Sequence, residues 1–260
     1  MAAQINPRQQ QIMDKAQQSG FVAIESLARE YGVTSQTIRR DINHLCKLGM
    51  LLRYHGGAGL PTSAENTAYD TRRDHLLTEK QRIATLTAAQ IPNYSSLFIN
   101  IGTTNEEVAR ALMAHHGLRI ITNNLNVAHL MSAKKDFEVI VASGVVRNQD
   151  RGVVGEATVD FISQFIVDFG VIGTSGIDMD GTLLDFDYRE VKVSQTIIKH
   201  SRRIFLVADH SKFGRNAMVR LGNISELSAL FTDQPPPTEI IEIAAASGTE
   251  IHLPGLYQNT

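Results

Sequence analysis

The sequence predicts an α/β protein in which a small N-terminal winged helix-turn-helix precedes a larger C-terminal doubly wound, mostly parallel sheet. Three observations lead to this fold class. A chain of 260 residues exceeds one ordinary domain, which favours two. Three short helical patterns, two of them separated by a glycine turn, occupy the first 60 residues. From Ser95 onward, apolar runs of strand length alternate with helical patterns, which is typical of βα units.

Composition excludes several classes of protein. Hydrophobic residues make up 43% and charged residues 20%, so a disordered or fibrous chain is not expected. No apolar run approaches the roughly 20 residues of a membrane helix, and the polar start of the chain is unlike a secretory signal. Cys46 is the only cysteine, which rules out an internal disulfide and a cysteine metal site. We therefore expect a cytoplasmic protein with no membrane partner.

No cofactor or metal motif is present. The glycines at 170, 173 and 176 lack dinucleotide spacing, and no phosphate-binding Walker loop occurs. His115, His116, His200 and His210 are not at metal-ligand spacing. Asp209, His210 and Ser211 are sequence neighbours and cannot converge as a catalytic triad. We expect neither a cofactor nor a metal.

Charge is distributed unevenly along the chain. Residues 1–60 carry seven Lys/Arg and four Asp/Glu, a formal charge of +3, and the remainder carries −5. A polyanion would therefore dock on the N-terminal part rather than on the acidic body.

Three helices are expected in this N-terminal part. The first runs from Pro7 to Gln18, since proline suits a first helical position. The second runs from Glu25 to Tyr31 and ends at Gly32, which suits a left-handed helix end. The third begins with Thr34 or Ser35 as its cap and runs to about Leu48.

The last two helices and their short turn predict a helix-turn-helix, whose second helix enters the DNA major groove with its N-terminal residues. Ile38, Ile42 and Leu45 form its buried stripe. The opposite face carries hydroxyls, amides and paired arginines, which can bind bases or phosphates. The DNA-contacting residues expected on this helix are Ser35, Gln36, Thr37, Arg39, Arg40 and Asn43.

A wing is expected directly after the third helix. The segment from Met50 to His55 is a predicted strand and ends in Gly56-Gly57, so Arg53 and His55 would reach the DNA backbone or minor groove. The alternative is a three-helix interaction module that binds no DNA and whose polar faces are only solvated.

The same residues resemble a known family. The segments 25–28, 33–42 and 53–58 are similar to the DNA-binding domain of the DeoR family of bacterial repressors, and the run Thr37-Ile38-Arg39-Arg40-Asp41 is highly specific to it. The similarity continues through nearly the whole chain. It implies a transcriptional repressor that binds double-stranded operator DNA as a homo-oligomer, a dimer or tetramer, and whose symmetry fixes the spacing of operator half-sites.

A connector joins the two parts. Leu60 to Thr67 is a polar loop with turn residues, and one helix is expected from Asp70 to Gln90. The predicted organisation is a DNA-binding domain at 1–60, a linker and connecting helix at 61–90, and a sensing domain at 91–260.

The body is expected to form a parallel sheet with helices on both faces, which binds ligands at the carboxyl ends of its strands. Strands are predicted at Leu97–Ile101, Arg119–Thr122, Glu138–Ala142, Phe169–Gly173, Ile204–Ala208, Ala229–Thr232 and Glu250–Leu253. Helices are predicted at Asn105–Ala114, Asn126–Ser132, Asp187–His200 and Thr238–Ala246.

Small polar loops follow several of these strands. Gly102-Thr103-Thr104 opens a helix, where free backbone N–H groups would receive a phosphate. Alternatively, one threonine simply caps the helix with Glu106 or Glu107. Three more such loops are Thr122-Asn123-Asn124, Gly173-Thr174-Ser175-Gly176 and Asp209-His210-Ser211-Lys212, in which Lys212 is a counter-charge for phosphate. Their convergence predicts a small anionic ligand.

The resemblance sharpens this prediction. The effector domain of the DeoR family is similar in fold to ribose-5-phosphate isomerase and CoA transferases and senses a phosphorylated metabolite, with glycerol 3-phosphate the effector that the similarity favours here. It implies further effector contacts from Arg147, Asp178, Glu190 and Lys192, beside Gly102, Thr103, Thr104, Thr122, Asn123, Asn124, Gly173, Thr174, Ser175, Asp209 and Lys212. Two positions depart from the family pattern: Asn100 replaces an acid and Ser143 replaces a glycine.

Two rival functions remain open at this point. One is the same repressor tuned to another sugar phosphate. The other is a phosphosugar isomerase in which Asp178, Glu190 and Lys212 transfer protons. A fold shared with enzymes does not by itself carry their activity over, which favours the repressor.

Overall fold

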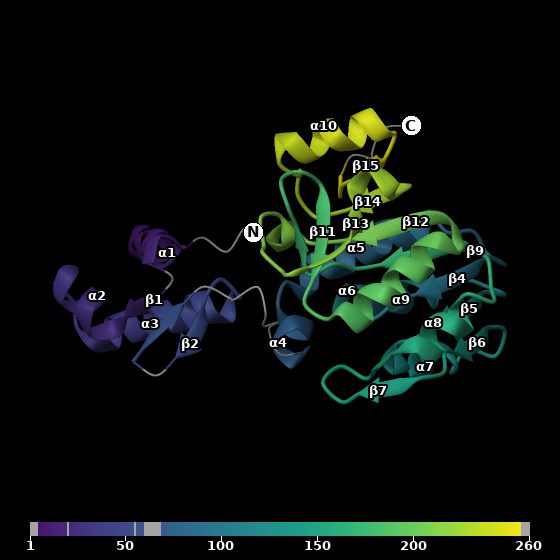
Figure 1. Ribbon diagram of the computed structural model, residues 1–260, viewed down its shortest axis with the longest axis horizontal. Helices are drawn as coiled ribbons and strands as arrows, with labels where there is room; N and C mark the ends of the chain where they lie inside the picture. Colours follow the sequence, from purple (N-terminus) through teal and green to yellow (C-terminus); the bar gives the residue numbers. More distant parts are fainter. Residues whose placement is uncertain (1–4, 20, 55, 60–68, 256–260) are drawn as a thin grey trace. The chain divides into compact units, whose positions relative to one another are not determined.

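The computed structural model describes residues 5–19, 21–54, 56–59 and 69–255. The chain divides into two compact units, Met1–Thr67 and Ala68–Thr260 (Figure 1). The expected boundary loop at 60–67 and the wing residue His55 lie outside the described residues.

The first unit contains three helices and a small antiparallel sheet. Its elements are α1 (Pro7–Ser19), β1 (Phe21–Ala23), α2 (Ile24–Glu30), α3 (Ser35–Lys47), β2 (Leu52–Tyr54) and β3 (Gly57–Gly59), with strand order β1-β3-β2. The helices and the wing strand follow the sequence prediction closely. Strands β1 and β3 were not predicted, because three residues give no recognisable period.

Local chemistry sets the boundaries of α3. The amide of Thr37 donates to the Thr34 hydroxyl at 3.3 Å, so Thr34 caps the helix. Gly32 has a φ of 61°, the left-handed conformation that ends α2 without a Cβ penalty. Ile38, Ile42 and Leu45 are fully buried in the core of this unit. The predicted stripe therefore anchors α3 and leaves its other face to solvent.

The second unit is built around a seven-stranded sheet with strand order β15-β14-β12-β9-β4-β5-β6, in which each pair of neighbours is parallel. The strands of this sheet are β4 (Ser96–Ile99), β5 (Arg119–Thr122), β6 (Glu138–Val141), β9 (Val167–Ile172), β12 (Ser201–Val207), β14 (Ala229–Phe231) and β15 (Glu250–His252). The order runs outward from β4 in one direction and from β9 in the other. The topological switch point, where such sheets bind ligands, therefore lies between β4 and β9.

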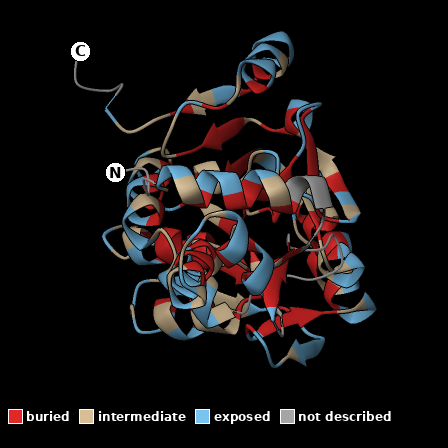
Figure 2. Ribbon diagram, turned by 90° about the vertical axis from the view of Figure 1, so that its left-hand side faces the viewer, coloured by how far each residue is buried: buried red, intermediate tan, exposed pale blue. Residues whose placement is uncertain are grey.

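Helices cover both faces of this sheet (Figure 1). One face packs on α5 (Leu77–Ala89), α6 (Thr103–Leu112) and α7 (Leu125–Met131), and the other packs on α8 (Glu156–Ile162), α9 (Tyr188–Lys199) and α10 (Thr238–Ser247). Each face has its own apolar core, and Figure 2 shows the buried residues concentrated on the strands between the helices. The predicted doubly wound architecture is confirmed.

Three features of the second unit were not predicted. A hairpin of β7 (Val145–Arg147) and β8 (Gly152–Val154) follows β6, and helix α8 follows the hairpin. A second, antiparallel sheet has the order β10-β11-β13, from β10 (Gly176–Ile177), β11 (Thr182–Asp185) and β13 (Val219–Asn223). These elements lie over the α9 face, where Ile177, Leu183 and Leu221 join its core.

The prediction of one helix from Asp70 to Gln90 is wrong. The segment forms two helices, α4 (Tyr69–Asp74) and α5, separated by Leu76 at a φ of 52°. The ammonium group of Lys80 donates to the carbonyl oxygen of His75 at 2.7 Å and also to the carbonyl oxygen of Arg72. Lys80 is only 3% exposed, so these carbonyls compensate part of the cost of burying its charge. These contacts within the segment join α4 to the first turn of α5 across the bend.

Candidate functional site

The outer face of α3 presents the residues that the sequence predicts for DNA contact. Gln36, Arg39, Arg40 and Asn43 are exposed, and Ser35 and Thr37 are half-buried at the start of the helix. The Ser35 hydroxyl donates to the carboxylate of Glu25 at 3.0 Å, which ties α3 to α2. Arg53 is exposed on β2. Four side chains on two successive turns of one helix thus form a continuous polar and cationic surface, which suits insertion into a groove.

The inner face of α3 contains an acid that sequence reasoning did not single out. Asp41 is 4% exposed and accepts hydrogen bonds from Arg8 Nε at 2.6 Å and Gln9 Nε2 at 3.0 Å, both on α1. Burial opposes ionisation of this carboxyl, but these donors hold its pKa below the usual value. The network fixes α3 against α1. An acid within an otherwise basic helix was the available signal.

In the second unit, the two loops at the switch point are those predicted for ligand binding. Gly102 has a φ of 143° and is the N-cap residue of α6, so neither threonine caps the helix as the alternative required. Thr103 and Thr104 lie buried in its first turn. Gly173 follows β9, and no side chain of the described residues caps the N-terminus of α6. Backbone amides at this helix end suit an anion.

Other predicted polar residues hold the framework of this edge. The Thr122 hydroxyl donates to the carbonyl of Ile99 at 2.6 Å, and the Asn123 amide donates to the carbonyl of Val153 at 3.1 Å. Asn124 caps α7. These buried side chains fix the loop after β5 against β4 and β8.

The loop after β9 is anchored in the same way. The Thr174 hydroxyl donates to the carbonyl of Leu184 at 2.9 Å, and the Ser175 hydroxyl donates to the Asp185 carboxyl at 2.9 Å. Asp185 is 5% exposed, and burial raises the pKa of its carboxyl. The small antiparallel sheet is thereby tied to the switch-point edge.

An arginine-centred cluster lies beside these loops. Arg147, at the end of β7, contacts Asp150 at 2.5 Å, Glu190 at 2.6 Å and Asp187 at 3.0 Å. Although the guanidinium is buried, Asp150 and Glu190 raise its pKa. Burial, together with the nearby Asp185, raises the pKa of Glu190 to about 7 despite Arg147. Arg147 and Glu190, predicted from distant parts of the sequence, are in direct contact.

A second cluster collects positive charge around Asp209. Burial, with repulsion from Arg215, Arg72 and Lys80, lowers the pKa of Lys212 to about 8, and Asp209 opposes the shift. Asp209 is 1% exposed; burial disfavours its ionised form, but Lys212 holds the pKa of this carboxyl below its usual value. Lys212, Lys80 and Arg215 each interact with Asp209, and Arg72 adds a further positive charge near Lys212. Such a site attracts a compact anion such as a phosphate.

Two predicted effector residues are not brought into these clusters. Asp178 is exposed in the turn after β10, and Lys192 is exposed on α9. The two departures from the family pattern also have local roles: Asn100 donates to Ser194 at 2.7 Å within the core, and the Ser143 hydroxyl donates to the carbonyl of Ala157 at 3.3 Å.

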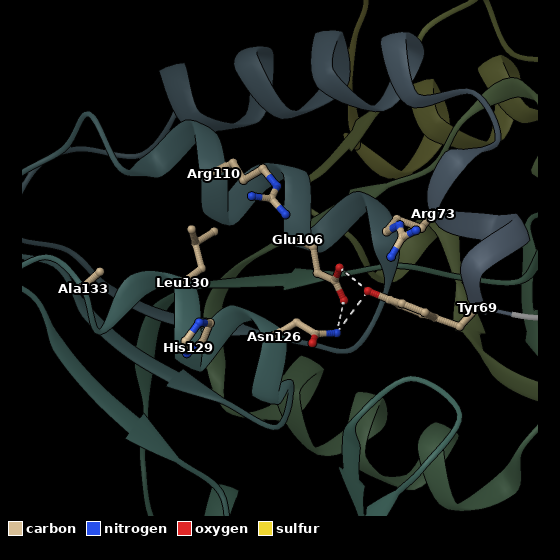
Figure 3. Close-up of a pocket in the computed structure, with 8 residues that line it drawn as sticks. All are labelled: Tyr69, Arg73, Glu106, Arg110, Asn126, His129, Leu130 and Ala133. Atoms are coloured by element: carbon tan, nitrogen blue, oxygen red, sulfur yellow. Dashed lines mark hydrogen bonds between the residues drawn. The ribbon is translucent and has the colours of Figure 1, made fainter.

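A cavity of about 490 Å³ opens on the side of α6, near the loop after β5 (Figure 3). Its polar centre is Glu106, which is 5% exposed and accepts from the Tyr69 hydroxyl at 2.7 Å and from Asn126 at 3.0 Å. Burial, and then the Glu106 carboxylate, raises the pKa of Tyr69 above its usual value. The lining residues are Tyr69, Arg73, Glu106, Arg110, Asn126, His129, Leu130 and Ala133.

Sequence reasoning missed several charged residues of the clusters. They are Arg72, Lys80, Asp150, Asp185, Asp187 and Arg215. Lys80 and Arg72 belong to a segment treated as a connector, and Asp185 follows an unpredicted strand. A signal existed for Asp150 alone, three residues after Arg147, which is close enough for a local ion pair.

The described residues contain neither a membrane-spanning helix nor a metal-binding cluster. None of their helices is long and apolar enough to cross a membrane. Within the same ranges, no group of three or more His, Cys, Asp or Glu side chains is arranged to hold a metal ion.

A unit with a cationic helix-turn-helix and a unit whose sheet edge is lined by polar loops and by clustered cations and carboxylates together define a DNA-binding regulator that carries a small-molecule sensor. Comparison with protein families agrees: residues 8–64 match the DeoR-like helix-turn-helix domain and residues 76–234 match the DeoR C-terminal sensor domain. The chain belongs to the DeoR family of transcriptional repressors. Its partners are accordingly operator DNA and a small-molecule effector.

Curated relatives align over nearly their whole length. The glycerol-3-phosphate regulon repressor of Escherichia coli K12 is 51% identical over 242 residues, which cover 93% of this chain and 96% of the relative. The protein of the same name from Haemophilus influenzae is 52% identical over 88% of this chain and 89% of the relative. The HTH-type transcriptional repressor CsqR of Escherichia coli K12 is 42% identical and covers 96% and 95%. All three are named repressors, which favours a regulator over the isomerase alternative.

Solved structures match more weakly. Ribose 5-phosphate isomerase from Plasmodium falciparum has a TM-score of 0.37 at 13% identity and covers 52% of each chain. The translation initiation factor eIF-2B of Pyrococcus horikoshii has a TM-score of 0.44 at 14% identity and covers 86% of this chain and 80% of the other. The family assignment does not depend on these partial matches.

Proposed function

We propose that this protein represses genes of glycerol 3-phosphate metabolism and is released from its operator by glycerol 3-phosphate. One observation carries the proposal: identity of 51% over 93% of the chain to a glycerol-3-phosphate regulon repressor, with no large part of either chain left unaligned. The contact residues are those of the outer face of α3 for DNA and those of the switch-point edge for the effector.

The chemistry of the sensor supports a small phosphorylated ligand. Lys212 and its neighbours Arg72, Lys80 and Arg215 supply positive charge for a phosphate that carries roughly 1.5 to 2 negative charges at neutral pH. The amides at the start of α6 supply additional donors. Buried amides and hydroxyls at the same edge suit the hydroxyl groups of a short polyol chain.

Release requires that the effector bind more tightly to the state that does not bind DNA, because equal affinity for both states would shift nothing. A coupling free energy of about 1–3 kcal/mol would weaken operator binding roughly 5- to 150-fold. We propose that the repressor acts in the cytoplasm as a symmetric homo-oligomer, a dimer or tetramer, so that paired α3 helices bind repeated half-sites.

The decisive experiment combines two titrations of the full chain. Fluorescence anisotropy with promoter fragments and random duplex at moderate salt measures operator preference, and isothermal titration with glycerol 3-phosphate and a panel of other sugar phosphates measures effector preference. We expect tight binding to one promoter class and its release by glycerol 3-phosphate alone. If another sugar phosphate releases the operator, that compound is the effector in place of glycerol 3-phosphate. If the protein binds every promoter fragment no more tightly than random duplex, the proposed function is overturned. Light scattering gives the oligomeric state.

A further inference from the structure

Helix α4 belongs structurally to the sensor rather than to a passive connector. It is the first described element after residues 60–68, which lead from the DNA-binding unit. Its residue Arg72 is 3.7 Å from the Asp150 carboxylate, next to the Arg147 cluster. The main-chain carbonyl of Arg72 accepts from buried Lys80 and from the Thr103 hydroxyl at 3.5 Å, at the start of α6. Both the side chain and the main-chain carbonyl of Arg72 therefore lie at the candidate effector site.

The guanidinium of Arg72 shares the electrostatic environment of the predicted phosphate ligand residue. It repels the protonated forms of Lys212 and Arg215, and it attracts the carboxylate of Asp185. These three residues come from β11 and from the loop after β12, far from α4 in the sequence. An anion bound at Lys212 would therefore lie within the field of Arg72.

The first residue of α4 is held by a separate contact. The Tyr69 hydroxyl donates to Glu106 at 2.7 Å and accepts from Asn126 at 3.1 Å, as Figure 3 shows. Glu106 also accepts from Asn124 at 3.2 Å, in the loop after β5. This Tyr69 latch connects the start of α4 to a loop of the switch-point edge.

We propose that α4 couples the two sites: Arg72 binds the anionic group of the effector, and the Tyr69 latch joins the first residue of α4 to the loop after β5, so that the start of α4 and the switch-point edge respond to the effector together. The inference rests on the proposed function, since it assumes an anionic effector that releases DNA. It assigns an effector contact outside the sensor core and names the element that carries the coupling.

The geometry around Asp150 leaves this carboxylate with other partners if Arg72 turns to the effector. Arg147 contacts this carboxylate at 2.5 Å and 2.9 Å, and the Gly152 amide donates to it at 3.2 Å. The contact from Arg72 is longer, at 3.7 Å. Asp150 therefore stays paired when Arg72 turns to a phosphate, and a bidentate bond to phosphate oxygens is stronger than a long ion pair.

The first test measures glycerol 3-phosphate affinity by isothermal titration in Arg72→Ala, Arg72→Lys and the control Arg82→Ala. Arg82 is exposed on α5, so its variant removes the same charge outside the cluster. Loss of a charge-assisted hydrogen bond predicts about 10- to 150-fold weaker binding for Arg72→Ala, with a smaller loss for Arg72→Lys. The control should stay within about twofold of wild type. Operator affinity without effector and the melting temperature are measured for every variant, so that a folding defect is distinguished from a loss of effector binding; both should be unchanged in the control Arg82→Ala.

The second test separates binding from coupling. Tyr69→Phe removes only the hydroxyl, so we expect glycerol 3-phosphate affinity within about threefold of wild type in the absence of DNA. The factor by which saturating effector weakens operator binding should fall at least about threefold, since reciprocal coupling is lost with the latch.

Wild-type effector affinity in Arg72→Ala, or an unchanged coupling factor in Tyr69→Phe, would overturn the inference while the proposed function stands. If the wild type responds to a different sugar phosphate, the same variants are titrated with that compound and the same outcomes apply. If the wild type responds to no phosphorylated metabolite, both the proposed function and the inference fall.

Discussion

The two units build their functional surfaces in opposite ways. The DNA-binding surface lies on one helix, where Arg39 and Arg40 are exposed on successive positions of α3. The sensor site collects its charges from α4, α5, the β7 hairpin and the loop after β12, and it buries them, with Lys80 only 3% exposed. A surface on a single helix can be predicted from periodicity. A site assembled from distant segments requires the fold.

This difference also fits the two ligands. Exposed arginines bind a long polyanion without first giving up partners, and their contribution is screened by salt. Buried cations must be paired in the absence of ligand, as Arg147 is with Asp150 and Glu190. Their partners therefore hold them in position for one small anion. When such a cation exchanges a carboxylate for the anion, the element that carries the carboxylate loses a contact.

The largest expected effect concerns the first unit. Arg39→Ala combined with Arg40→Ala should weaken operator binding by about 2–6 kcal/mol, because each arginine can contribute about 1–3 kcal/mol through base or phosphate contacts. Glycerol 3-phosphate affinity should be unchanged. Anisotropy titrations at two salt concentrations measure the loss, and Lys47→Ala, at the far end of α3, is the control. If Lys47→Ala weakened operator binding as much as the arginine variant, the prediction that the N-terminal turns of α3 make the DNA contacts would be wrong.

The next effect concerns the sensor. Lys212→Ala should weaken glycerol 3-phosphate binding by about 1.5–3 kcal/mol, the range for a hydrogen bond to a charged group, and yield a repressor that stays on its operator. The sequence predicts Lys192 as an effector contact, but its side chain is exposed on α9, away from the charge clusters. Lys192→Ala should therefore leave the affinity for the effector within about twofold of wild type. Operator release measured at increasing effector concentration checks both variants. Normal release of Lys212→Ala would refute its assignment.

A smaller effect is expected on the stability of the DNA-binding unit alone. Asp41→Ala removes the acceptor of Arg8 and Gln9 and should destabilise this unit by about 1–3 kcal/mol. Because the pKa of Asp41 is lowered on folding, its contribution is complete above its unfolded value near 3.8 and is lost as pH falls through the lower folded value. Calorimetry of the full chain measures it. Asp14→Ala, an exposed acid of α1, should change little.

The smallest expected effect is a pH dependence of effector binding. Lys212 faces Asp209, Arg215, Arg72 and Lys80, and its pKa of about 8 means that it loses its proton as pH rises past neutrality. Affinity for glycerol 3-phosphate should be about three- to fivefold weaker at pH 8.5 than at pH 7. Lys212→Arg should abolish this decline because arginine stays protonated. A decline that persists in Lys212→Arg would assign it to another group.

The acidic side of the profile has the opposite sign. Below pH 7 protonation of Glu190, whose pKa is about 7, removes a negative charge next to Arg147 and should strengthen anion binding. The gain ends near pH 6, where the phosphate itself takes up a proton. Titration of Glu190→Gln, which lacks the ionisable carboxyl, should show a flat profile between these values.

Much of the fold was predictable from the sequence because its elements are locally encoded. The strand at Arg119–Thr122 was predicted to the residue, since it combines β-branched residues with a polar loop that follows. The start of α3 followed from Thr34 and Gly32. The hairpin β7–β8 was missed because strands of three residues carry no period.

The sensor site was less accessible to sequence reasoning. The strand-end loops were found because parallel strands bring their carboxyl ends together. Arg72 and Lys80 were missed because their contact depends on the bend at Leu76, which the helical pattern did not predict. Asp178 was predicted from its motif, yet the structure exposes it. The membership of a charge cluster assembled across a whole unit is a property of packing, not of spacing.

The bend itself has an energetic meaning. Leu76, between α4 and α5, occupies a left-handed backbone region that costs an ordinary residue roughly 1–2 kcal/mol. That cost is similar in size to a typical coupling free energy between two ligand sites of one protein, about 1–3 kcal/mol. The carbonyl contacts of Lys80 on either side of this residue are therefore part of what holds α4 and α5 at their angle.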